Sequence, residues 1–253
     1  MERSVINLVV DKKKTLSKLN GADFKDNKIT NLVMNRVSKP AEEITKIIEE
    51  NIISRIEKGM ESVVNQVILH TAPHHDDIEL AYLPYITHLV RTPLNKHHFS
   101  YMTSGFTAVT NSFMLNLMQN LMNFLNSGVF VKRLSENYFN SKNIDGKNRD
   151  VMLYLDGVAG HSRTLQNEAS ARRLLRNIME VCDEDNLALL KDRVNELIDY
   201  FKTQYPGKKD IAYVQKLKGM QREFEAEVFW GYYGFSVEDV SHLRLGFYQG
   251  DIF

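Results

Sequence analysis

The sequence predicts an α/β fold built on a parallel sheet and carrying a large helical insertion. The first observation is a β-branched apolar run at 63–70, which is typical of a buried strand. The second is an amphipathic helical pattern at 78–91, and the third is another strand-like run at 99–103. Strand, loop, helix and strand in this order form a βαβ unit. In such sheets the loops at the carboxyl ends of the strands line the ligand crevice.

Composition divides the chain into a polar extension and a larger domain. Residues 1–40 are lysine-rich with weak apolar periodicity, so we interpret them as an extension or linker. Pro40 then opens a helical pattern that ends near Gly59, and we assign 41–253 to the α/β domain.

The middle of the chain, at about 111–210, is interpreted as a helical insertion between sheet elements. After an Asn- and Lys-rich loop at 134–150, helices and a strand are predicted at 164–181, 187–204, 210–230 and 242–248. Arg172, Arg173 and Arg176 share one face of the first of these helices. Such a face could bind a phosphate group or could be exposed to solvent, and the solvent-exposed face is the favoured interpretation.

Composition also excludes several classes of function. Lys+Arg and Asp+Glu both number 32, so the charge balance predicts no nucleic-acid or membrane partner. One cysteine excludes an intramolecular disulfide framework, and the N-terminus has no signal-peptide core, so we expect a cytoplasmic protein. The stretch 99–131 has no charged residue, but Asn and Gln recur along it at helical spacing. This stripe indicates a buried or half-buried helix and not a membrane span.

The segment Pro-His-His-Asp-Asp at 73–77 follows the first predicted strand and carries the residues best suited to chemistry. His74 and Asp77 are spaced so that a nitrogen and an oxygen ligand can bind one zinc ion. Zinc lowers the pKa of bound water to about 7, so Asp76 suffices as the general base for attack on an amide carbonyl. The alternative is a helix N-cap, in which Asp76 or Asp77 accepts backbone N–H groups of the following turn.

The stretch Thr71–Leu80 (TAPHHDDIEL) resembles the HPDD motif of the LmbE-like (PIG-L) N-acetylglucosaminyl deacetylases, with His75 in place of proline. Tyr101–Gly105, Lys218–Ala226 and Leu243–Tyr248 are similar to later parts of the same family. The likeness is greatest to the variant appended to bacterial glucosamine-6-phosphate deaminase-like proteins.

The resemblance implies a Rossmann-like, partly parallel sheet and a zinc cofactor held by His74 and Asp77. It implies Asp76 as the general base and Arg222 as a residue that holds the sugar. The family's acidic substrate contact would fall near Gln249 or Asp251, and its third zinc ligand lies past the equivalent of the last residue. The chain therefore resembles the front part of the domain, with the sheet incomplete at its C-terminal side.

These observations predict a zinc-dependent hydrolase that deacetylates an N-acetylated amino sugar or a related small-molecule conjugate. Two other interpretations stay open. One is a truncated, catalytically incomplete domain with a binding or assembly role, and the other is part of a glucosamine-6-phosphate deaminase-like protein. Besides the small-molecule amino-sugar substrate, the expected partner is either a second copy of the chain in a homo-oligomer or a missing C-terminal portion.

Overall fold

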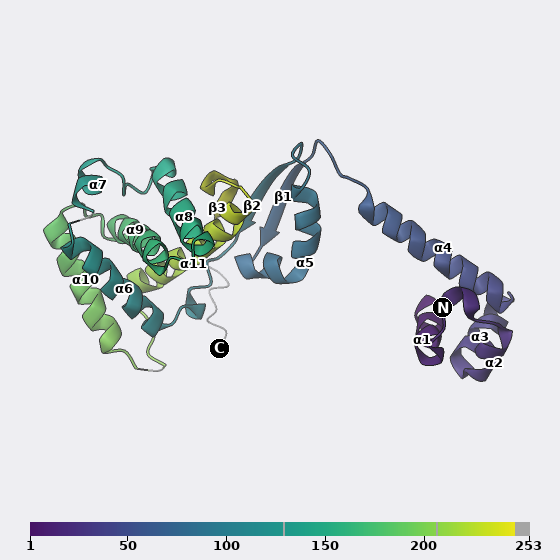
Figure 1. Cartoon of the computed structure of the whole chain (residues 1–253). Coiled ribbons are helices and arrows are strands. Elements are labelled where there is room, and N and C mark those ends of the chain that lie inside the picture. Colours follow the sequence, from purple (N-terminus) through teal and green to yellow (C-terminus); the bar gives the residue numbers. More distant parts are fainter. Residues whose placement is uncertain (129, 206, 246–253) are drawn as a thin grey trace. The chain divides into compact units, whose positions relative to one another are not determined.

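The structure is a computed structural model that describes residues 1–128, 130–205 and 207–245, apart from the side chains of Val131 and Ser135. The chain divides into two compact units, one from Met1 to Val63 and one from Val64 onward (Figure 1). Most described residues are helical, and a small three-stranded sheet with parallel pairing completes the fold. The predicted mixed α/β class is confirmed.

The N-terminal unit is a helical body, and not the polar linker that the sequence predicts for residues 1–40. Its core contains Val5 and Leu8 from the first helix and Phe24 from the second, all fully or almost fully buried. Its elements are α1 (Glu2–Lys12), the 3₁₀ helix η1 (Leu16–Lys18), α2 (Gly21–Asp26), α3 (Lys28–Val37) and α4 (Ala41–Met60).

The helices within residues 1–40 are short, which explains why the sequence pattern did not predict this unit. α2 has only six residues, too few to display a helical period, and both α2 and α3 begin at N-caps. The Asn20 side chain accepts the N–H groups of the first turn of α2, and Asn27 does the same for α3. α4 begins after Pro40 as predicted, but Ile44 and Ile48 pack into the core of this unit. The boundary therefore lies at Val63 and not at residue 40.

The second unit is built around three parallel strands, β1 (Val67–Ala72), β2 (Lys96–Tyr101) and β3 (Val240–His242), in the order β1-β2-β3. Helix α5 (His75–Val90) connects β1 to β2. The strands and helix thus lie where the βαβ pattern predicts them, with small shifts of their ends. The strand predicted at 242–248 differs: β3 ends at His242, residues 243–245 are not in a strand, and the part from residue 246 lies outside the described residues.

One face of this sheet carries its hydrophobic core. Crossover connections between parallel strands are right-handed, so a sheet whose strands follow one another in sequence order receives its connections on the same face. Phe99 of β2, Ile78 of α5 and Trp230 accordingly belong to one buried cluster. On the opposite face Val67 and Leu69 are 73% and 64% exposed. Sheets that are doubly wound bury both faces, so the described strands show the parallel α/β class and no finer fold.

Helices occupy the span between β2 and β3, where the sequence predicts an insertion. They are η2 (Phe106–Ala108), α6 (Asn111–Asn126), α7 (Val131–Ser135), α8 (Ile144–Ala159), α9 (Arg163–Cys182), α10 (Leu187–Lys202), α11 (Ala212–Tyr232) and η3 (Val237–Asp239). α8 corrects the loop predicted at 134–150. Its N-cap is Asn143, whose Oδ1 accepts the N–H of Gly146 at 2.8 Å. Val151 of this helix is buried.

α6 is the helix that the uncharged stretch at 99–131 predicts. It buries Met114, Met118, Leu121 and Leu125 in the core of the helical layer, together with residues of α9 and α10. Its polar side stays outside this core, and Asn120 donates to the carbonyl oxygen of Asn167 at 3.0 Å. Over the described ranges, no helix combines the length and apolar character that crossing a membrane requires.

The three arginines of α9 are buried and engaged by protein groups, so the solvated face that the sequence favours is wrong. Arg176 donates from Nε and Nη2 to Asp150 Oδ2, at 3.2 and 2.9 Å. Its Nη1 donates to the carbonyl oxygens of Tyr138 and Asn140 at 2.7 and 2.8 Å. Arg172 donates to Glu168 of its own helix. No guanidinium here is left pointing toward solvent, which also disfavours the phosphate interpretation.

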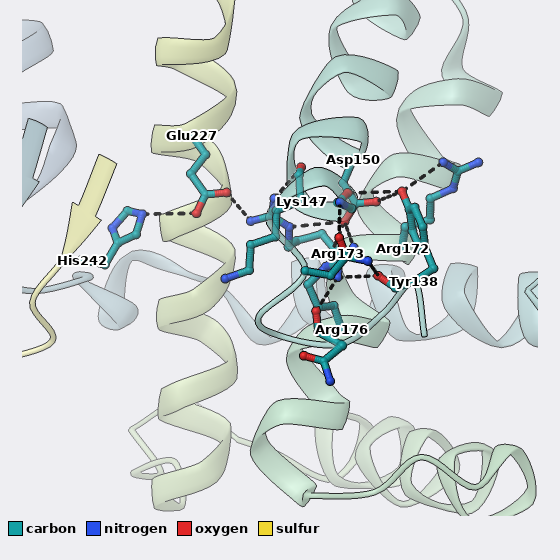
Figure 2. A network of polar contacts seen from close by, with 11 residues as sticks. Tyr138, Lys147, Asp150, Arg172, Arg173, Arg176, Glu227 and His242 are labelled. Carbon is teal, nitrogen blue, oxygen red and sulfur yellow. Dashed lines mark hydrogen bonds and ion pairs between the residues drawn. The ribbon is translucent and has the colours of Figure 1, made fainter. Parts of the chain in front are cut away.

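Arg173 extends this network from the helical layer to the sheet (Figure 2). Its Nε lies 3.7 Å from Asp150 Oδ2 of α8, and its Nη1 donates to Glu227 of α11. Glu227 Oε1 in turn lies 3.5 Å from His242 Nε2, at the end of β3. Burial opposes the ionisation of Glu227, but Arg173 and His242 hold its pKa below its ordinary value. A chain of polar contacts therefore joins α8, α9, α11 and β3.

Candidate functional site

The His-His-Asp-Asp turn lies at the carboxyl edge of the parallel sheet. β1 ends at Ala72, and Pro73 stays beside β2 because its carbonyl oxygen accepts the N–H of Thr103 at 3.0 Å. His74 is the N-cap residue of α5. Asp76 and Asp77 occupy the first turn of α5, where carboxylates interact favourably with the positive end of the helix dipole. The turn thus occupies the position at which parallel α/β sheets bind ligands.

His74 and Asp77, the two predicted metal ligands, lie close together. His74 Nδ1 is 3.6 Å from Asp77 Oδ2. The same Asp77 oxygen accepts the backbone N–H of His74 at 3.0 Å, so this carboxylate also caps the helix. The predicted capping arrangement differs from this one, because Asp77 accepts the N–H of the preceding residue, His74, and not an N–H of the following turn. Because a carboxylate has two oxygens and about four acceptor positions, one capping bond leaves capacity for a further ligand.

Asp76 is paired with Arg222, which the fold brings from α11 to the turn. Arg222 Nη2 lies 3.0 Å from Asp76 Oδ1, and Nη1 lies 3.1 Å from Glu225 Oε2. Partial burial opposes the ionisation of Asp76, but the Arg222 charge, a backbone N–H and His75 together hold its pKa below the ordinary value. Asp76 is thus kept ionised at neutral pH. The structure therefore brings all four predicted site residues to one edge of the sheet.

Three further residues of this edge were not predicted as site residues: His75, Glu79 and Glu225. His75 is buried, its ring meets Tyr101 edge-on, and its Nε2 lies 3.7 Å from Glu225 Oε2. Burial, with Arg222 nearby, lowers the pKa of His75 to about 4. Burial and the repulsion of Asp76 raise the pKa of Glu79 to about 7. The signal in the sequence is the i, i+4 spacing of His75 and Glu79, which places both on one helix face.

The loop after β2 supports the ring of His74. Gly105 has a positive φ of 64°, and a Cβ built on it would lie 2.9 Å from His74 Cδ2 and 3.1 Å from Nε2. Gly219 of α11 approaches the same loop, because a Cβ there would overlap Ser104 Oγ. Two glycines therefore allow α11, the loop and the His74 ring to pack closely.

The other histidines make their own contacts. His70 and His97 stack face to face, and His70 Nε2 lies 3.0 Å from His97 Nδ1 inside the sheet core. His242 stacks on Tyr101 and faces Glu227. Within 1–128, 130–205 and 207–245, no three His, Cys, Asp or Glu side chains form a group that could hold a metal ion.

The buried His70–His97 pair makes stability pH-dependent. Burial, and then the neighbouring His97, lower the pKa of His70 from 6.5 to about 4. The unfolded chain binds a proton below about 6.5 that the folded chain rejects until about 4. We therefore expect the free energy of unfolding to decrease as the pH is lowered from about 6.5 to about 4. The decrease should reach up to about 3 kcal/mol, since each pKa unit is worth about 1.4 kcal/mol. Urea unfolding at pH 7 and pH 4.5 measures this loss, which His70→Gln should reduce and the exposed His98→Gln should not. An equal loss in wild type and His70→Gln would contradict this assignment.

Two cavities adjoin the turn. The larger has a volume of about 450 Å³, and its walls come from α5, α6, α8, α9 and α11. The smaller, of about 260 Å³, is lined by Arg222 and by residues 108–110. Phe113 and Glu225 line both cavities, so the two are neighbours. The predicted acidic contact near Gln249 or Asp251 lies outside the described residues.

No protein-family model, curated protein or solved structure matches this chain. Its function is therefore inferred from the chemistry of the turn and of the cavities beside it.

Proposed function

We propose that the protein is a metal-dependent amide hydrolase that removes the acyl group from an N-acylated amino sugar or a related conjugate. The observation that carries this proposal is the meeting of Asp76 with Arg222 beside the His74–Asp77 pair, with Nη2–Oδ1 at 3.0 Å and Nδ1–Oδ2 at 3.6 Å. The likeness of the turn to the HPDD motif of the LmbE-like deacetylases supports it. In the same proposal β1, β2 and β3 are one half of a Rossmann-like sheet.

The chemistry of the donors fits a divalent metal in part. An imidazole nitrogen and a carboxylate oxygen are ordinary zinc ligands, and His74 and Asp77 supply them from one helical turn. Zinc sites use three or more protein ligands, and the described residues supply these two. A bound zinc ion would polarise the amide carbonyl and activate water at neutral pH.

The other residues have separate roles in this proposal. Asp76 accepts a proton from the attacking water, and its ion pair with Arg222 keeps it ionised for that task. Arg222 lines the smaller cavity, where its guanidinium group can donate to a polar group of the substrate. Glu225 orients Arg222 through the contact at 3.1 Å.

A zinc titration of the full chain tests the proposal. We expect His74→Ala and Asp77→Asn each to weaken zinc binding by at least about tenfold, because each removes one of few ligands. Asn at 77 retains an oxygen that can accept the His74 N–H, so the helix cap survives while the anionic ligand is lost. Isothermal titration calorimetry measures the affinities, and His98→Ala on the exposed side of β2 is the control. Equal affinity in wild type, His74→Ala and Asp77→Asn would refute the metal site and favour a binding role.

The glycine beneath His74 offers a separate test of the same site. Gly105→Ala is expected to weaken zinc binding. The new methyl carbon would lie 2.9 Å from His74 Cδ2, which is too close, so the His74 ring would have to move. Gly234→Ala is the matched control, since its φ is also positive, at 91°, and nothing lies within 4 Å of its Cβ position. Both variants should lose about 1–2 kcal/mol of stability from backbone strain. Only Gly105→Ala should change the zinc affinity, and the same affinity in both variants would show that the His74 ring does not bind the ion.

A further inference from the structure

The larger cavity beside the turn has walls of two kinds. Three i, i+4 pairs face it, each from one side of one helix: His75 and Glu79 of α5, Phe113 and Leu117 of α6, and Gln221 and Glu225 of α11. The remaining lining residues are mostly apolar or aromatic and come from α8, α9 and α11: Tyr154, Ser170, Phe224, Val228 and Phe229. An apolar space with a few polar groups is the usual composition of a small-molecule site, and about 450 Å³ is within the usual range of size.

Two polar groups of this cavity have no protein partner in the described ranges. Gln221 is 4% exposed, and its Nε2 is a buried donor without a hydrogen bond. Glu79 Oε1 is a buried acceptor without a hydrogen bond. Because buried polar groups are nearly always hydrogen-bonded, an unpaired donor and an unpaired acceptor lining the same cavity indicate a ligand that supplies their partners. The ligand must offer an acceptor to Gln221 Nε2 and a hydrogen-bonding group to Glu79 Oε1.

A secondary amide offers both groups, a carbonyl oxygen and an N–H, on adjacent atoms. The apolar walls then require a substituent much larger than the methyl group of an acetamide, which would leave most of the cavity empty. We infer that this cavity binds the amide and the apolar acyl chain of an N-acylated amino sugar whose acyl group is longer than acetyl. The inference rests on the proposed function, because it assigns the substrate class of the same site.

Continuity between cavity and turn supports this assignment. His75 and Glu225 line the cavity and lie 3.7 Å apart, and Glu225 shares Arg222 with Asp76. Arg222 itself lines the neighbouring smaller cavity. A molecule with an acyl chain in the larger cavity and a sugar toward the smaller one would pass Phe113 and Glu225, which border both.

Binding of N-acyl glucosamines to the metal-free full chain tests the inference. N-acetyl-, N-butanoyl-, N-hexanoyl- and N-octanoyl-glucosamine are titrated in the presence of a chelator, so that no hydrolysis occurs, and Kd is measured by calorimetry. We expect the affinity to rise about threefold to fourfold for each added methylene group, because each is removed from water. A Kd that does not depend on chain length in the wild-type protein would overturn the inference.

Two variants with matched controls test the two kinds of wall. Leu117→Trp fills the apolar part and should abolish the dependence on chain length, whereas Asn116→Trp, on an exposed position of the same helix, should preserve it. Gln221→Met removes the unpaired donor and should weaken every ligand about tenfold. Gln215→Met is its control, because the Gln215 amide already donates to Asp210 O at 2.8 Å. A folded Leu117→Trp protein with the wild-type dependence on chain length would contradict the inference.

Failure of the inference and failure of the proposed function give different results. A dependence on chain length, together with zinc affinity that His74→Ala does not change, would support the cavity and refute the metal-dependent hydrolase. Zinc binding through His74, with acyl-chain affinity that does not vary, would refute the cavity assignment alone.

Discussion

Asp150→Ala is expected to lower the free energy of unfolding of the second unit by about 3–5 kcal/mol, because removing one partner of a buried ion pair leaves the other charge uncompensated. Asp150 is fully buried, and its Oδ2 accepts two hydrogen bonds from Arg176. Its Oδ1 accepts the Tyr138 hydroxyl at 2.7 Å, and Arg173 lies 3.7 Å from Oδ2. The substitution would leave two buried guanidinium groups without their shared carboxylate.

Urea unfolding followed by tryptophan fluorescence measures this loss. The chain has one tryptophan, Trp230, which is fully buried in the sheet core, so its emission reports on the second unit. Asp156→Ala is the matched control, because Asp156 is an exposed carboxylate on the same helix, and its loss should change stability by less than about 0.5 kcal/mol. Asp150→Asn should lie between the two, since the amide keeps an acceptor but loses the charge. A loss below about 1 kcal/mol for Asp150→Ala would show that the network is not structural.

Asp76→Asn is expected to reduce kcat for acyl release by about 10²–10⁴-fold, the usual contribution of a general base. The amide has nearly the same shape as the carboxylate but cannot take a proton from water. Its amide oxygen can still face Arg222, whose Nη2 lies 3.0 Å from Asp76 Oδ1, so the turn should keep its geometry. Release of the carboxylic acid from an N-acylated glucosamine by the zinc-loaded full chain measures kcat.

The zinc affinity of the same variant separates a proton acceptor from a metal ligand. If Asp76 transfers protons, Asp76→Asn should bind zinc with nearly wild-type affinity while Asp77→Asn does not. Asp192→Asn, at an exposed position of α10, controls for the loss of a negative charge. Unchanged kcat in Asp76→Asn, or a zinc affinity reduced as far as in Asp77→Asn, would contradict the assigned role.

The helices and strands that the sequence predicted best are those with a long or clear period. β1, α5 and β2 lie where the apolar pattern predicts them, and so do α9 and α10. The four elements before α4 were missed because each has at most 11 residues, and caps such as Asn20 and Asn27 fix the starts of two of them. Local signals therefore failed where helices were short.

The sequence by itself determined the candidate turn, because His74, Asp76 and Asp77 are held together by one helix start and need no distant partner. Only the tertiary structure decided which side chains from other elements meet them. Arg222 contacts Asp76 because α11 packs against elements that are distant in the sequence. Arg173 and Arg176 are buried beside Asp150 because α9 does the same. A helical period shows that such residues share a face, but whether that face meets water, a carboxylate or a cavity depends on packing.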